Sequence, residues 1–149
     1  MNQSPHKMHL LLATLLLLSA IFPFMTMAGK PSKSLGLETA VRMAESEIKH
    51  FPDIMGVDYN NRPVWNYTQG LIAQAMMELY AVTGNKAFYS YGRSYADRMI
   101  DEQGHIQGYK PEEYNIDRLN SGKFLFDLYN ETHDERYKKA IFQLRDQLK

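Results

Sequence analysis

One segment of this chain occurs twice, and this repeat constrains the fold more than any other feature. Residues 79–97, LYAVTGNKAFYSYGRSYAD, and residues 128–146, LYNETHDERYKKAIFQLRD, align without a gap at an offset of 49 residues. Thr83 aligns with Thr132, and Asp97 aligns with Asp146. Units that recur at such a period are typical of arrays or closed rings, in which each unit buries its apolar face against its neighbour.

The residues inside each copy predict a helical hairpin. We expect the first helix to end at the threonine and a tight turn to follow. Asn85 and Asp134 then stand where a side chain can accept hydrogen bonds from the free N–H groups of the next helix. Gly84 suits a left-handed residue at the end of the earlier helix.

Apolar residues recur at helical intervals along the rest of the chain, so further helices are expected. No stretch alternates apolar and polar residues for long enough to indicate a strand. The sequence therefore predicts an all-α fold. The five apolar stripes are Leu37, Ala40, Val41, Ala44 and Ile48; Ile72, Ala75, Met76 and Leu79; Phe88, Tyr91, Tyr95 and Met99; Leu119, Leu125, Phe126 and Tyr129; and Tyr137, Ala140, Ile141, Leu144 and Leu148.

These stripes make roughly two and a half hairpins, and a closed ring would need about twice as many. We therefore expect residues 29–149 to be the N-terminal portion of a larger helical domain, incomplete in this chain. The oligomeric state is not predicted.

Residues 1–28 have the organisation of a secretory signal peptide. Lys7 precedes an apolar run from Met8 to Phe24, and small residues end at Ala28, after which cleavage is expected. The alternative is an uncleaved membrane anchor, since the run is about long enough to span a bilayer when tilted. Pro23 and the small residues favour cleavage. The mature protein is then expected to be secreted or periplasmic, with no stable membrane insertion.

Composition excludes several classes of function. Seventeen basic residues balance seventeen acidic ones, so the chain lacks the basic field that phosphate backbones require, and no nucleic-acid partner is expected. Cysteine is absent, which excludes disulfides, thiolate metal ligands and a cysteine nucleophile. The five histidines show no ligand spacing, and no Gly-rich phosphate loop is present. No metal and no cofactor are expected.

The segments before the second and fourth predicted helices carry the unusual residues. NNRPVWNYTQG holds Trp65 and Tyr67, and GHIQGYKPEEYNIDR holds Tyr109, Tyr114 and Asp117. Alternate helices of an up-and-down array run in the same direction, so both helix entrances should lie on one side. Aromatic faces beside carboxylate and amide groups suit a sugar ring and its hydroxyls.

Each of these residues also has a purely structural interpretation. Asp117 can satisfy the N-terminal end of a helix dipole. Trp65 and Tyr67 can be core or hairpin-packing residues. Without further information, these structural roles are the commoner ones.

Residues 65–148 resemble a known family. WNYTQG, the TGN turn, IDEQG and NIDRLNSG occur in the order found in glycoside hydrolase family 105, the unsaturated rhamnogalacturonyl hydrolases. The unsaturated glucuronyl hydrolases of family 88 are more distant. The resemblance implies an (α/α)6 toroid whose mouth binds an oligosaccharide, and this chain would supply its first part.

The resemblance also implies a reaction. Family 105 enzymes remove a terminal 4,5-unsaturated galacturonyl residue from pectin-derived oligosaccharides: an aspartic acid protonates C4, water adds at C5, and the resulting hemiketal opens. By this resemblance Asp117 is the supporting active-site carboxylate and a substrate contact, and Tyr67 and Trp65 line the mouth. The principal acid is expected beyond Lys149, so residues 1–149 alone should be inactive.

Two other functional classes stay open. An exported helical-repeat binding module is one, although such repeats run to about 34 residues rather than 49. Another toroid enzyme, either an unsaturated glucuronyl hydrolase or a polysaccharide lyase, is the second, because one fold can carry different chemistries.

Overall fold

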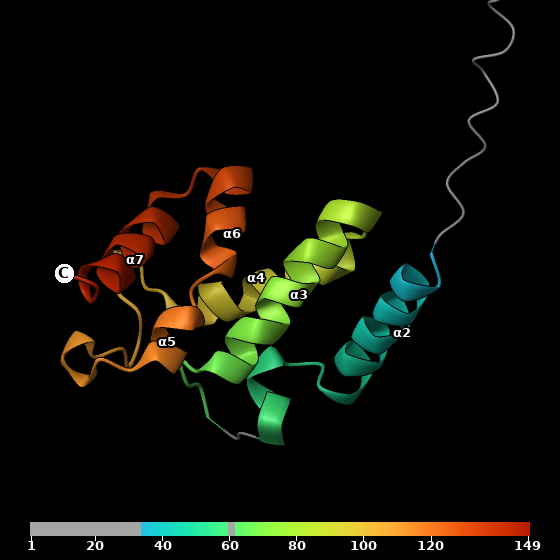
Figure 1. Ribbon diagram of the computed structural model, residues 1–149, viewed down its shortest axis with the longest axis horizontal. Coiled ribbons are helices and arrows are strands. Elements are labelled where there is room, and N and C mark those ends of the chain that lie inside the picture. The colour runs from blue at the N-terminus through green and yellow to red at the C-terminus, as the bar shows by residue number, and fades with distance from the viewer. Residues whose placement is uncertain (1–33, 60–61) are drawn as a thin grey trace, which may run out of the picture. The chain divides into compact units, whose positions relative to one another are not determined.

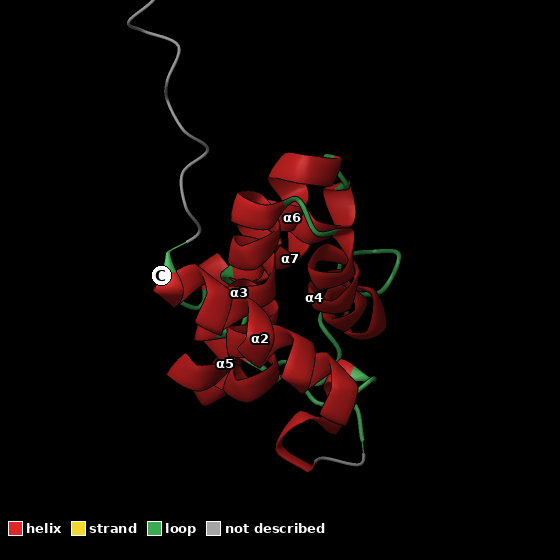
Figure 2. Ribbon diagram, turned by 90° about the vertical axis from the view of Figure 1, so that its right-hand side faces the viewer, coloured by secondary structure: helices red, strands yellow, loops and turns green. Residues whose placement is uncertain are grey.

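The described part of the chain is built from helices. The computed structural model describes residues 34–59 and 62–149, so the predicted signal peptide lies outside the described residues. Figure 2 shows helices joined by loops, and the only β pairing among the described residues is an isolated bridge between Ile100 and Ile106. The all-α prediction is confirmed. The elements are α2 (Leu35–His50), the 3₁₀ helix η2 (Ile54–Tyr59), α3 (Tyr67–Thr83), α4 (Lys86–Met99), the 3₁₀ helix η3 (Pro111–Glu113), α5 (Ile116–Asn120), α6 (Phe124–Thr132) and α7 (Glu135–Asp146).

The predicted hairpins are α3–α4 and α6–α7, and α6 packs beside α3 (Figure 1). The repeat is longer than the sequence alignment suggested. The first residue of α3 and the first residue of α5 are 49 positions apart, and so are the last residues of α3 and α6. Helices α5 and α6 together therefore occupy one repeat position, equivalent to α3 alone.

The two hairpin turns have the same geometry. Gly84 and His133 occupy equivalent positions with φ of 68° and 56°, and each backbone N–H donates to a carbonyl of the preceding turn at 2.8 Å. The expected caps also form, since Asn85 accepts from the N–H of Ala87 at 3.0 Å and Asp134 from the N–H of Arg136 at 2.9 Å. Each pair of helices is thus closed by its local sequence.

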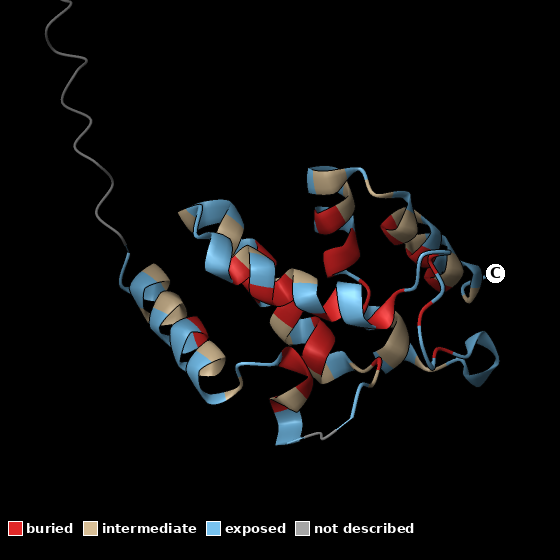
Figure 3. Cartoon of the chain, turned by 180° about the vertical axis from the view of Figure 1, so that it is seen from behind, coloured by how far each residue is buried: buried red, intermediate tan, exposed pale blue. Residues whose placement is uncertain are grey.

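Buried aromatic rings hold the hairpins together. Phe88 and Tyr95 from α4, Phe124 from α6 and Tyr137 from α7 are all at most 1% exposed. In Figure 3 the buried residues gather on η2, α3, α4, α6 and α7, whereas α2 is mostly exposed and buries only Ala44. The core therefore lies between the two hairpins.

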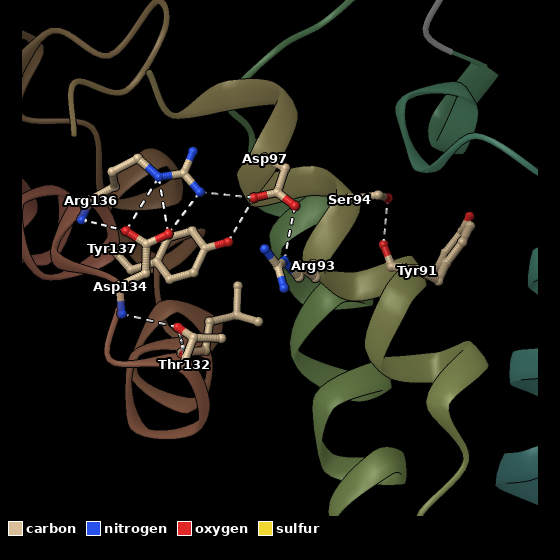
Figure 4. Close-up of polar contacts among 9 residues, drawn as sticks. Tyr91, Arg93, Ser94, Asp97, Thr132, Asp134, Arg136 and Tyr137 are labelled. Atoms are coloured by element: carbon tan, nitrogen blue, oxygen red, sulfur yellow. Dashed lines mark hydrogen bonds and ion pairs between the residues drawn. The ribbon is translucent and has the colours of Figure 1, made fainter. Parts of the chain in front are cut away.

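A polar cluster joins α4 of the first hairpin to α7 of the second (Figure 4). The Tyr137 hydroxyl donates to Oδ1 of Asp97 at 2.7 Å, and Arg93 Nε donates to Oδ2 of the same carboxylate at 3.0 Å. Arg136 Nη2 lies 3.4 Å from Asp97 and 2.8 Å from Asp134. Burial and the Asp97 contact raise the pKa of Tyr137 far above its usual value, so this hydroxyl stays a donor.

The prediction of one continuous fourth helix is wrong. Residues 121–123 form a turn between α5 and α6, where N–H groups bond carbonyls three residues back, as from Gly122 to Leu119 at 3.2 Å. The break changes which residues face inward. Phe124 is fully buried, while Phe126, expected in the apolar stripe, is 56% exposed. Gly122 leaves room for Leu144, whose Cδ1 would clash with any Cβ at this position.

Candidate active-site entrance at two helix N-termini

The segment that enters α3 packs against α4 and is hydrogen-bonded to it. Trp65 is 1% exposed and stacks on Tyr95, with ring centroids 5.1 Å apart and an interplanar angle of 10°. The Tyr95 hydroxyl accepts the N–H of Asn66 at 2.9 Å and lies 3.2 Å from the carbonyl of Val64, to which it can donate. Tyr67, the first residue of α3, follows directly and is 48% exposed.

The segment that enters α5 is ordered by its own polar residues. The Asn115 side chain caps the helix by accepting the N–H of Asp117 at 3.0 Å. The hydroxyl of Ser121 donates to the Asp117 carbonyl at 2.9 Å, one turn further on. The backbone at Asp117 is thus bonded on both sides, while its carboxylate is exposed.

Two contacts join these segments. The indole Nε1–H of Trp65 donates to the carbonyl of Arg118 at 2.8 Å. Gly70 lies so close to Ser121 that a Cβ at position 70 would stand 2.5 Å from Ser121 Cα. Tyr67 precedes Gly70 by three residues and Asp117 precedes Ser121 by four, so each lies about one helical turn before this contact. The two entrances lie side by side, as the sequence predicted.

The candidate residues have different surroundings. Tyr67 and Asp117 are exposed at adjacent helix starts, so both are available to a ligand. The substrate-binding expectation for Trp65 needs correction, because its ring is only 1% exposed and packs against Tyr95 and Phe124. Tyr109 is also a packing residue, 7% exposed with its hydroxyl 2.6 Å from Oε1 of Gln147.

Sequence reasoning missed the residues that bring the entrances together. Gly70 and Ser121 make the close approach, and Tyr95 had been assigned only to an apolar stripe. A signal for Gly70 was present, because a glycine within an otherwise good helical pattern indicates a close packing contact. Nothing comparable distinguishes Ser121 from other serines.

A further polar side chain lies in the first turn of α3. Gln69 is fully buried and its Nε2–H donates to the carbonyl of Val57 at 3.0 Å, which fastens the η2 segment to α3. Its Oε1 has no hydrogen-bond partner among the described residues.

The two entrances offer an exposed carboxylate, at Asp117, and an exposed aromatic ring, at Tyr67. Over residues 34–59 and 62–149, no three His, Asp or Glu side chains gather closely enough to hold a metal ion. In the same part of the chain, none of the helices combines the length and apolar character needed to cross a bilayer. The available chemistry is hydrogen bonding by a carboxylate and stacking on an exposed tyrosine.

The chain is similar to known glycoside hydrolases over most of its length. The sequence profile of Glycosyl Hydrolase Family 88 matches residues 39–149. The chain is also similar to the solved structure of a family 105 glycoside hydrolase from C. acetobutylicum ATCC 824, with 35% sequence identity and a TM-score of 0.65. That match covers 78% of this chain and 29% of the other, so this chain spans less than a third of the length of its structural relative.

Paired helices, two adjacent entrances and these similarities define part of a helical toroid of the kind found in glycoside hydrolases of families 88 and 105. The chain belongs to Glycosyl Hydrolase Family 88, with a family 105 enzyme as a structural relative. The assignment made from WNYTQG and NIDRLNSG is confirmed at this level, and so is the partial toroid fold.

Proposed function

We propose that this chain contributes the first part of an unsaturated rhamnogalacturonyl hydrolase. The whole enzyme is then a protein in which residues 29–149 are joined to the remainder of such a toroid. The observation that carries the proposal is the hydrogen bond from Trp65 to the Arg118 carbonyl. It ties the α3 entrance, with exposed Tyr67, to the α5 entrance, with exposed Asp117.

The proposed reaction suits these groups. Hydration of a 4,5-unsaturated uronyl residue requires protonation at C4 and water at C5, and positioned carboxyl groups can serve both needs. Asp117 is the supporting carboxylate, which contacts the sugar ring, and Tyr67 provides an aromatic face beside it. The principal acid lies outside residues 1–149 in this proposal, so the 149-residue chain alone should not turn over substrate.

Loss of the double-bond absorbance of unsaturated rhamnogalacturonan disaccharide tests the proposal. The whole enzyme should consume the double bond, and Asp117→Asn should lower kcat at least about a hundredfold, the range expected for a group that acts on the reacting atoms. Asp127→Asn is the matched control. Asp127 is an exposed carboxylate of α6 whose Oδ2 accepts a hydrogen bond from Gln74 Nε2 at 3.2 Å, and the amide oxygen of asparagine can still accept it. Unchanged kinetics for Asp117→Asn would return this residue to a structural role.

A second candidate is favoured by a specific observation. The matching profile is that of family 88, the family that gave the more distant resemblance, so an unsaturated glucuronyl disaccharide is the competing substrate. The ratio of kcat/KM for the two disaccharides decides between them. We expect it to favour the rhamnogalacturonan substrate.

The expected location is a further proposal. Residues 1–28 are proposed to direct export, so the enzyme would act on oligosaccharides outside the cytoplasm. A mature N-terminus at Gly29 in protein recovered from the periplasm or medium would support this, and an intact Met1 in cell-retained protein would contradict it.

A further inference from the structure

Trp65 and Tyr95 stack on each other, and each makes a hydrogen bond to one entrance: Trp65 to the Arg118 carbonyl and Tyr95 to the Asn66 N–H. We infer that Trp65 and Tyr95 are positioning residues: Trp65 fixes Asp117 through the Arg118 carbonyl, and Tyr95 fixes Tyr67 through the backbone of Asn66. This inference rests on the proposed function. It assigns a role to two buried residues that contact no substrate themselves.

The contact to the α5 entrance depends on one donor. Arg118 follows Asp117 directly, and its carbonyl accepts the indole N–H at 2.8 Å from a ring that is 1% exposed. α5 has only five residues, so it is too short to be stable by its own backbone bonds. Its direction is therefore set by outside contacts. Loss of the indole N–H would leave a carbonyl without its donor and let the first turn of α5 move.

The Arg118 side chain also restrains the start of α5. Its Nη1 lies 2.9 Å from the Gly108 carbonyl, to which it donates, and 3.0 Å from Oε2 of Glu113. The residue next to Asp117 is thus held by its backbone to the α3 entrance and by its side chain to the loop before α5. A shift of about 1 Å at a reacting group can cost about a hundredfold in rate, so such restraint matters for catalysis.

The contact to the α3 entrance depends on the Tyr95 hydroxyl. The hydroxyl oxygen accepts a hydrogen bond from the backbone N–H of Asn66 at 2.9 Å and lies 3.2 Å from the Val64 carbonyl oxygen. Asn66 precedes Tyr67 and is the N-terminal cap residue of α3, but its side chain makes no capping bond. The hydroxyl of Tyr95 therefore helps to orient the start of α3. Burial raises the pKa of Tyr95 far above its usual value, so the hydroxyl keeps its proton at any working pH.

Two substitutions separate the two halves of the pair in the whole enzyme. Trp65→Phe removes the donor to Arg118 and should lower kcat about tenfold with KM nearly unchanged, because Asp117 loses alignment. Tyr95→Phe keeps the ring stack and removes the hydroxyl, so it should raise KM severalfold through Tyr67 with a smaller effect on kcat.

Tyr91→Phe is the matched control. Tyr91 lies one turn earlier on α4, is 7% exposed, and donates its hydroxyl at 2.7 Å to the carbonyl of Phe51, which belongs to neither entrance segment. Its loss removes a comparable buried hydrogen bond. Both kinetic constants of Tyr91→Phe should stay within about twofold of the parent protein at a temperature well below every Tm.

A double-mutant cycle distinguishes positioning from general damage. If Trp65 acts through Asp117, then Trp65→Phe should have little further effect on kcat in an Asp117→Asn background. Hydrogen exchange of the amides of residues 116–121 supplies an independent readout. It should become faster in Trp65→Phe and stay unchanged in Tyr91→Phe.

The outcomes separate the two claims. Additive losses in the cycle, or unaltered exchange of residues 116–121 in Trp65→Phe, would overturn the positioning role even in an active enzyme. Absence of turnover by the parent protein would instead overturn the proposed function, and the exchange comparison would still decide whether Trp65 holds α5.

Discussion

The hydroxyl of Tyr137 in α7 donates to Asp97 in α4 at 2.7 Å, so this hydrogen bond joins the second helices of two successive hairpins beside the Arg136–Asp97 contact. The donor is completely buried, and its acceptor is also bonded by Arg93. This bond therefore contributes to the packing of one repeat on the next.

Tyr137→Phe should weaken this junction. A hydrogen bond to a charged group contributes about 1.5–3 kcal/mol, so we expect a loss within or slightly below that range in the free energy of unfolding. Tyr109→Phe is the control, because its hydroxyl bonds the neutral Gln147 near the end of the chain and should contribute less. Urea unfolding followed by circular dichroism measures both. Equal losses for the two variants would contradict a special role for Asp97.

The two phenylalanines around the break in the fourth helix should differ sharply. Phe124→Ala removes a fully buried ring that packs on Tyr95, and should cost about 3–5 kcal/mol. Phe126→Ala removes a ring that is 56% exposed and should cost under about 1 kcal/mol. Thermal unfolding of both variants checks the register. A continuous helix, as the sequence predicted, would give Phe126 the larger effect.

Gly70→Ala should disturb the contact between the entrances. The new Cβ would meet the backbone of Ser121 at 2.5 Å, which a side-chain rotation cannot relieve, so α3 and α5 must separate. We expect a loss of about 1–3 kcal/mol, as for other overpacked sites. Gly84→Ala meets no atom within 4 Å and should lose only the cost of its left-handed φ, about 1–2 kcal/mol. A tolerated Gly70→Ala would argue against the close approach.

Asp134 provides a pH test. Hydrogen bonds from Arg136 lower the pKa of this carboxyl below its unfolded value of about 3.9, so the folded state favours the charged form. Its contribution to stability is present above that unfolded pKa and is lost as the pH falls through the lower folded pKa. Asp134→Asn cannot titrate and keeps a capping oxygen, as Asn85 does in the first hairpin.

The measurement is the difference in unfolding free energy between the parent chain and Asp134→Asn. That difference should shrink as the pH falls from about 6 to about 3. A pH-independent difference would mean that the Arg136 contact does not stabilise the charged carboxyl.

Local signals in the sequence accounted for much of the fold. The two turns were predictable because Thr-Gly-Asn and Thr-His-Asp place a capping side chain directly after the end of a helix. The break at residues 121–123 was not, because it depends on the packing of Gly122 against Leu144, a contact between residues far apart in sequence.

The site was predicted only in part, for a related reason. The places of Tyr67 and Asp117 at helix starts were predictable, and their role as sugar contacts stays a prediction. The burial of Trp65 did not, because an aromatic residue in an entry segment can face either the core or the solvent. Its stacking on Tyr95 decides between them, and that contact is set by tertiary packing.

The central claim is that Asp117 and Tyr67 together contact the sugar at the mouth of the toroid. A crystal structure of the whole enzyme carrying Asp117→Asn, with unsaturated rhamnogalacturonan disaccharide bound, tests it most directly. We predict the unsaturated ring within hydrogen-bond distance, about 3 Å, of the side chain at position 117 and beside the Tyr67 ring. A disaccharide bound elsewhere, with both side chains facing bulk solvent, would contradict the account.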